Sequence, residues 1–242
     1  MKYKLIGGGM VHSCHIARPS SDFNEKVKYL EINQQGVIGS KYIGDERSIG
    51  IREMASLGAM GLSKNMRIKN MRKVTAMFMS DWVDIAKQAG IVSNGNRVSF
   101  CLEKEKENPG FETCIPIDFM AGASGENLVL MLHENYTYMV TRESLLTSFS
   151  NVPIGTIVVF KKEGEKVPTA SLVVTAPNTP CHIPNTEIYE RFKRNTTLEV
   201  DKSNFDFNRL AQGKRGLLFE PFTSGTIKPG QSFEIWIPDT LP

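Results

Sequence analysis

The chain has little of what holds small extracellular folds together or anchors a protein in a membrane. It has 242 residues but only four cysteines, and a chain of this length buries on the order of 70 % of its unfolded surface, so disulfide staples are not needed. The longest apolar run, Leu128–Leu132, is far shorter than the ~20 residues of a membrane-spanning helix. The segment Leu5–Val11 is too short and glycine-rich for a signal peptide. We therefore expect no membrane span, no secretion, and free thiols in a reducing compartment.

One segment lacks carboxylates. The chain has 29 basic and 26 acidic side chains, which gives a net charge of +3. Between Glu53 and Asp81 there is no aspartate or glutamate, so this segment carries all of the excess positive charge. Its five cations, and two auxiliary cations further along the chain, are Lys64, Arg67, Lys69, Arg72, Lys73, Lys214 and Arg215.

Cations without neighbouring carboxylates can displace counterions from a nucleic-acid backbone, which gives salt-sensitive binding with no sequence preference. Phe78 is the only aromatic residue near the segment, so phosphate contact is expected to dominate over base stacking. The alternative interpretation is a solvated basic face that binds nothing.

The chain also lacks an established catalytic or metal-binding motif. Its cysteines and histidines cluster only at His12, Cys14 and His15 and at Cys181 and His182. Thiolate and imidazole are ligands that zinc prefers, but this spacing matches no established zinc module. A Cys–His nucleophile pair and a loop without any ligand remain open. We expect no metal and no cofactor. Gly7–Gly9 lacks the lysine and the following helix of a phosphate-binding loop, which favours a flexible turn.

Alternating apolar residues and turn residues predict many short strands. Ser80 is a predicted N-cap for a helix over 81–89 that ends at Gly90, and a second helix is expected to begin at Thr141. A hairpin is predicted over 27–36, another over 98–119, and a short helix over 51–63. The other predicted strands are Arg72–Ser80, Leu128–Leu132, Tyr136–Val140, Thr156–Phe160, Ala170–Thr175 and Ser232–Ile237.

Strands separated by turns, with two helices in the connections, predict a mainly β protein. The specific expectation is a single antiparallel β-sandwich of the jelly-roll type over residues 63–242. Residues 1–62 are expected to form an irregular N-terminal extension that consists of a hairpin and a short helix.

The order of these elements over residues 71–176 resembles the thirty-kilodalton superfamily of plant-virus movement proteins. Val98–Leu102 and the charged stretch after it match the family's first strand, and Leu128–Leu132 and Asn135–Thr137 match the next two. Thr141, Glu143 and Leu145-Leu146 then lead to Thr156–Phe160, and Ala170–Val174 closes the unit. The family's aspartate after the first strand is replaced by Glu103 and Lys104.

The resemblance implies a non-enzymatic viral protein that binds single-stranded nucleic acid, chiefly RNA, and self-associates. It also implies transport from cell to cell, with location in the host cytoplasm at intercellular channels and with viral coat protein or host factors as partners. In this interpretation the seven cations listed above contact the backbone.

Two other classes fit the same sequence. A jelly-roll capsid or another self-assembling structural protein, located in the virion, would use apolar surface such as the methionines between Met54 and Met79 for its interfaces. An enzyme would use Cys14 or Cys181 with a nearby histidine.

Overall fold

A computed structural model describes residues 2–19, 24–48, 67–88, 120–132, 152–178, 185–195 and 206–239. Several predictions fall outside these residues, namely the helices over 51–63 and from Thr141, the hairpin over 98–119 and the strand Tyr136–Val140. The candidate residues Lys64, Cys181 and His182 also lie outside them.

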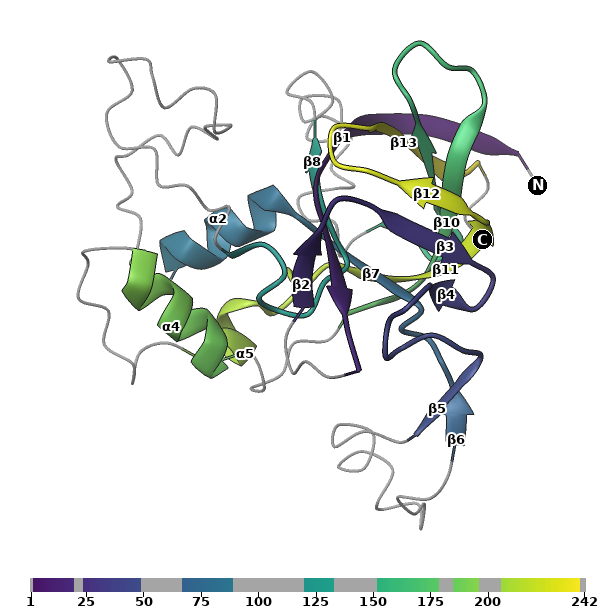
Figure 1. The fold of residues 1–242 in the computed structure, drawn as a ribbon. Helices are drawn as coiled ribbons and strands as arrows, with labels where there is room; N and C mark the ends of the chain where they lie inside the picture. Colours follow the sequence, from purple (N-terminus) through teal and green to yellow (C-terminus); the bar gives the residue numbers. More distant parts are fainter. Residues whose placement is uncertain are drawn as a thin grey trace, which may run out of the picture.

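A closed barrel forms the body of the described residues (Figure 1). Its strands follow the order β13-β9-β10-β11-β7-β8-β1, and β1 pairs with β13 to close the ring. The pair β7–β8 is parallel and the other neighbours are antiparallel, so the barrel is mixed. The bounds are β1 Tyr3–Ala17, β7 Val74–Phe78, β8 Leu128–Leu132, β9 Ile157–Lys161, β10 Pro168–Pro177, β11 Leu217–Thr223 and β13 Ser232–Pro238.

Shorter strands extend the barrel at three places. Strand β2, Asn24–Val27, pairs with the end of β1. Strands β12 Gly225–Ile227, β3 Leu30–Asn33 and β4 Gly36–Val37 form a small separate sheet. Strands β5 Glu46–Ser48 and β6 Arg67–Lys69 form a two-stranded ladder that lies away from the barrel in Figure 1.

The expected mainly β content is confirmed, but the jelly-roll sandwich is wrong. A sandwich has two facing sheets, whereas here the outermost strands pair with each other and leave one continuous wall. The N-terminal segment is also not an irregular extension, because β1 pairs with β13, β8 and β2.

Side chains fill the barrel interior, as small barrels require. Val74, Ala76 and Phe78 of β7 point into this core, together with Leu128 and Leu130 of β8. The alternate residues point outward into a second core beneath the helices α2 Met79–Gln88, α4 Asn185–Asn195 and α5 Phe207–Leu210. Figure 1 shows these helices together on one side of the barrel.

The glycines of β1 serve close strand packing and not a turn. Gly7–Gly9 lie inside the strand, where a β-carbon on Gly9 would meet the carbonyl oxygen of Met131 on β8. The same atom would approach the ring of Phe233 on β13. The turn predicted for these glycines is therefore wrong, since the backbone of β1 is pressed between its two neighbours.

Candidate nucleic-acid interface

The basic arm, which we define as strands β5 and β6, carries two of the candidate cations. Its antiparallel register pairs Glu46 with Lys69 and Ser48 with Arg67. Side chains alternate along a strand, so Arg67 and Lys69 lie on the same face of the ladder. Their side chains are 61 % and 69 % exposed. The structure thus presents both cations to solvent on an element that stands away from the barrel (Figure 1).

Both arm cations have acidic neighbours. Arg67 Nε lies 3.3 Å from Glu46 Oε2, and Lys69 Nζ lies 3.0 Å from Glu220 Oε1 on β11. On the face that carries Arg67 and Lys69, Glu46 leaves a charge of +1, which Glu220 balances, while Arg47 pairs with Ile68 on the opposite face. Surface ion pairs of this kind contribute about 0–1 kcal/mol, so a phosphate can compete with them.

Lys73 makes its contacts within the protein and is not exposed for binding. Its side chain is only 9 % exposed, and its ammonium group donates to Gln34 O at 3.0 Å and to Asp45 Oδ1 at 2.7 Å. Asn70 is also buried and donates to the carbonyl oxygens of Tyr42 and Gly44. Lys73 and Asn70 therefore fix the base of the arm to the chain before β5. Half-buried Arg72 lies between them.

The two auxiliary cations lie with the helices. Lys214 Nζ pairs with Asp84 Oδ2 of α2 at 3.0 Å. Arg215 is buried and donates to the carbonyl oxygen of Ser124 at 2.6 Å. These contacts hold the segment after α5 against α2 and the 120–127 loop, on the side of the barrel away from the arm (Figure 1). The structure does not bring Lys214 and Arg215 together with Arg67 and Lys69.

Cys14 and its neighbouring histidines point to opposite faces of β1. Cys14 lies in the barrel core with its thiol against the carbonyl oxygen of Ile227, and burial raises the pKa of that thiol to about 12. A thiol with such a pKa is neither a nucleophile nor a ready metal ligand. No group of three histidine, cysteine or acidic side chains suited to a metal occurs within the described ranges.

Ser13 links the two histidines on the outer face of β1. Its hydroxyl lies 2.9 Å from His15 Nε2 and 3.2 Å from His12 Nδ1. Burial lowers the pKa of His15 to about 3, and the positive charges of Lys26 and Arg191 add to the effect. His15 is therefore neutral at physiological pH. It sits against Gly122, which has a φ of +81° and whose missing side chain leaves room for the imidazole ring.

A buried carboxylate organises the loop that packs on His15. Glu126 Oε1 accepts hydrogen bonds from Trp82 Nε1 at 3.0 Å and Gly122 N at 2.8 Å. Its Oε2 accepts from Ser124 N at 3.1 Å and Ser124 Oγ at 2.7 Å. Four donors from the chain itself satisfy this carboxylate, so Glu126 ties the 120–127 loop to α2. Glu126 and its four donors therefore hold β1, β8 and the helices together.

Sequence reasoning missed the acidic partners of the basic segment. Glu220 lies 151 positions after Lys69, and only the pairing of β11 beside β7 brings it to the arm. Asp45 precedes its partner Lys73 by 28 residues, and Glu46 precedes its partner Arg67 by 21 residues. No local sequence signal reports these contacts, because they depend on strand order.

The fold is similar to that of solved bacterial structures. Neither a protein-family model nor a curated protein sequence matches the chain. The YuaD protein from Bacillus subtilis aligns over 98 % of this chain and 100 % of its own, with a TM-score of 0.65 and 17 % identity. At this identity the likeness defines the fold alone, a YuaD-like mixed barrel, and overturns the jelly roll.

Two further structures align less closely. A hypothetical protein has a TM-score of 0.46 at 16 % identity, covering 94 % of this chain and 69 % of its own. YiiM from Escherichia coli has a TM-score of 0.42 at 16 % identity, covering 100 % of this chain and 72 % of its own. Neither supports a conclusion about function. Within the described segments, no helix is long and apolar enough to cross a membrane.

Proposed function

We propose that the protein binds single-stranded nucleic acid without catalysing a reaction on it, and that the basic arm is the contact. The observation that carries this proposal is the ladder β5–β6, which displays the 61 % and 69 % exposed side chains of Arg67 and Lys69 on one face. Two exposed cations on one face of a ladder can contact the phosphates of a nucleic-acid backbone when these phosphates displace the paired carboxylates.

The acidic neighbours of the arm set the strength of this contact. Each phosphate must displace Glu46 from Arg67 or Glu220 from Lys69, so the expected affinity is modest and falls as salt rises. Lys73, Lys214 and Arg215 take no part in the proposed contact because they are engaged within the fold.

Self-association and transport between plant cells remain predictions from the resemblance, and capsid assembly remains the rival prediction. The jelly roll implied by that resemblance is not the fold of this chain, and the proposal here does not depend on a viral origin.

Salt titration of nucleic-acid binding tests the proposal. The measurement is fluorescence anisotropy of a labelled oligouridylate between 50 and 200 mM salt, for the wild type and for the double variant Arg67→Ala, Lys69→Ala. Two lost phosphate contacts should lower the salt slope of log K by about 1.4 and weaken binding about tenfold at low salt.

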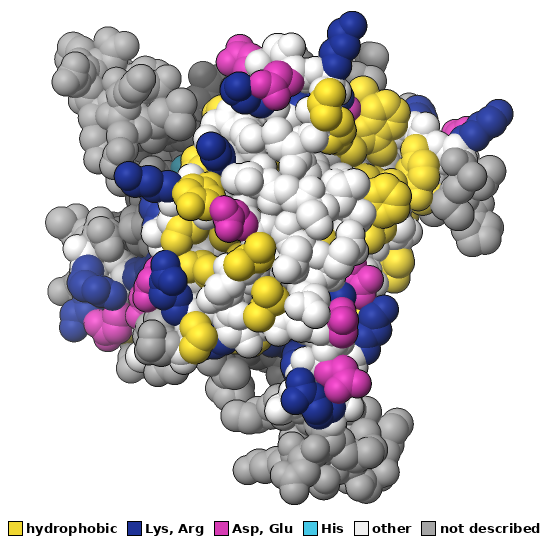
Figure 2. Space-filling model, turned by 45° about the vertical axis from the view of Figure 1, so that its right-hand side comes forward, with side chains coloured by type: hydrophobic (Ala, Val, Ile, Leu, Met, Phe, Trp, Pro, Cys, Tyr) yellow, Lys and Arg dark blue, Asp and Glu magenta, His cyan; other side chains and the backbone are white. Residues whose placement is uncertain are grey.

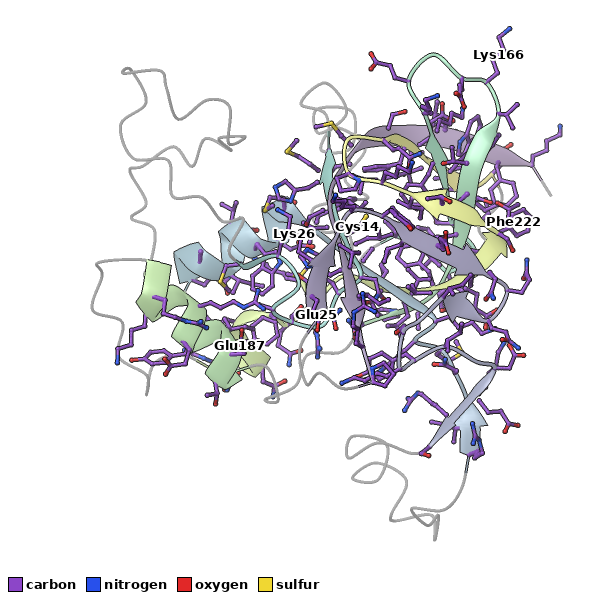
Figure 3. All side chains as sticks on the ribbon, in the orientation of Figure 1. Cys14, Glu25, Lys26, Lys166, Glu187 and Phe222 are labelled. Atoms are coloured by element: carbon purple, nitrogen blue, oxygen red, sulfur yellow. The ribbon has the colours of Figure 1, made fainter. Side chains whose placement is uncertain are left out.

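The matched control is Lys26→Ala, Lys193→Ala, which removes two exposed cations from β2 and α4, away from the arm (Figures 1 and 3). This control should bind like the wild type. An equal loss in both double variants would show that net charge alone drives binding, and absence of wild-type binding at 50 mM salt would reject the function.

A further inference from the structure

Strand β11 carries an exposed aromatic side chain two residues after Glu220, which pairs with Lys69 of the arm. Phe222 is 58 % exposed, although rings of this size usually lie in cores. The register of β10 with β11 pairs Leu172 with Pro221 and Ser171 with Thr223, so Phe222 is the extra residue of a bulge. Bulges commonly re-aim a side chain. In Figure 3 Phe222 lies at the outer edge of the molecule.

Phe222 is close to the cations of the arm. Phe222 follows Glu220 by two residues, a span of at most about 7 Å, and its exposure places it on the solvent side of β11, where partly exposed Glu220 also lies. Glu220 in turn holds the ammonium group of Lys69 at 3.0 Å. An exposed ring and an exposed cation therefore lie within one or two nucleotide lengths of each other.

An open groove of about 820 Å³ begins where β11 ends. Gly225 and Thr226 of β12 form one part of its lining, and they follow Phe222 by three and four residues. Thr169 of β10 and Gln231 form another part, held together by a hydrogen bond from Gln231 Nε2 to Thr169 Oγ1 at 3.3 Å.

Two exposed lysines line this groove from opposite turns. Lys162 comes from the turn after β9 and Lys228 from the turn before β13. Lys162 pairs with Glu165 at 2.7 Å, and Glu163 also lines the groove. The groove is thus an open surface depression whose charged lining residues are two lysines with long side chains and one glutamate.

We infer that a single nucleic-acid strand runs from the basic arm across Phe222, which stacks on a base, into the groove, where Lys162 and Lys228 contact phosphates. This inference rests on the proposed function and extends the nucleic-acid contact from the basic arm to Phe222 and the groove. Every base has a π face, so an exposed ring beside cations suits binding that ignores sequence. A duplex has no free base faces and cannot use Phe222.

Substitution of Phe222 separates stacking from charge. Loss of one stacked base should weaken oligouridylate binding by about five- to 150-fold. Phe222→Ala should show that loss without a change in the salt slope, and its binding to a duplex of the same length should equal that of the wild type. Phe222→Trp should bind with the affinity of the wild type, unlike Phe222→Ala. The bound strand should quench the fluorescence of the tryptophan at position 222.

The control for Phe222→Ala is Ile154→Ala, which removes another exposed apolar side chain, 67 % exposed, from the turn before β9. It should leave binding unchanged, and the thermal midpoints of all variants should match. A wild-type affinity in Phe222→Ala, with the arm variant impaired, would overturn the path and leave the proposed function standing. Absence of wild-type binding would overturn both.

Oligonucleotide length tests the groove. Lys162→Ala, Lys228→Ala should lower the salt slope for a long oligouridylate by about 1.4. It should have no effect on a strand of three nucleotides, which spans only the arm and Phe222. An equal effect at both lengths, or none at either, would contradict the groove as part of the path.

Discussion

At the residue scale, burial decides what each polar side chain can do. Cys14 and His15 are adjacent in sequence and were candidates for one metal or catalytic site. The pleat of β1 directs Cys14 into the barrel and His15 outward. Burial raises the pKa of Cys14 and lowers the pKa of His15, so both side chains stay neutral. Alternation along a strand already separates Cys14 from His15, but the sequence does not show that this segment is a strand or which of its faces is buried.

The low pKa of His15 predicts acid-sensitive stability. In the unfolded chain a histidine takes up a proton near pH 6.5, whereas folded His15 resists it until about pH 3. The unfolded state binds more protons across this window, so the free energy of unfolding falls as pH falls, in total by about 5 kcal/mol. Urea unfolding at several pH values should show His15→Gln with a shallower pH dependence than the wild type. Parallel curves would contradict the assignment.

At the element scale, local patterns located five of the seven barrel strands in the described part of the chain and missed β1 and β11. Leu128–Leu132 is β8 to the residue, and β7, β9, β10 and β13 lie close to their predicted bounds. The helix predicted from Asp81 begins two residues earlier, at Met79. Helices α4 and α5 were missed because α4 presents few apolar residues and α5 is one turn long, although Asp206 caps α5 through Asn208 N and Arg209 N.

The glycines of β1 were misassigned because glycine normally disfavours strands. Close approach of β8 explains the exception and yields a stability prediction. Gly9→Ala would place a methyl group against the carbonyl oxygen of Met131 and the ring of Phe233. Such overpacking should destabilise the protein by about 1–3 kcal/mol in urea unfolding. A change below about 0.5 kcal/mol would show that β1 can move away from its neighbours.

At the scale of the whole molecule, strand order determines both the fold and the charge of the site. The strands of a sandwich and of a barrel have the same local pattern, and only the pairings β1–β13 and β7–β8 distinguish them. The same long-range order brings Glu220 to Lys69. The sequence therefore located the cations of the arm but could not show their acidic neighbours, nor place Phe222 and the groove beside them.

Neutralising those acidic neighbours is the most direct test of the central claim. Glu46→Gln, Glu220→Gln keeps the shape of both side chains and removes their competition for Arg67 and Lys69. If phosphates bind at the arm, the affinity for oligouridylate at fixed salt, measured by anisotropy, should rise several-fold above that of the wild type. An unchanged or lower affinity would contradict binding at the basic arm.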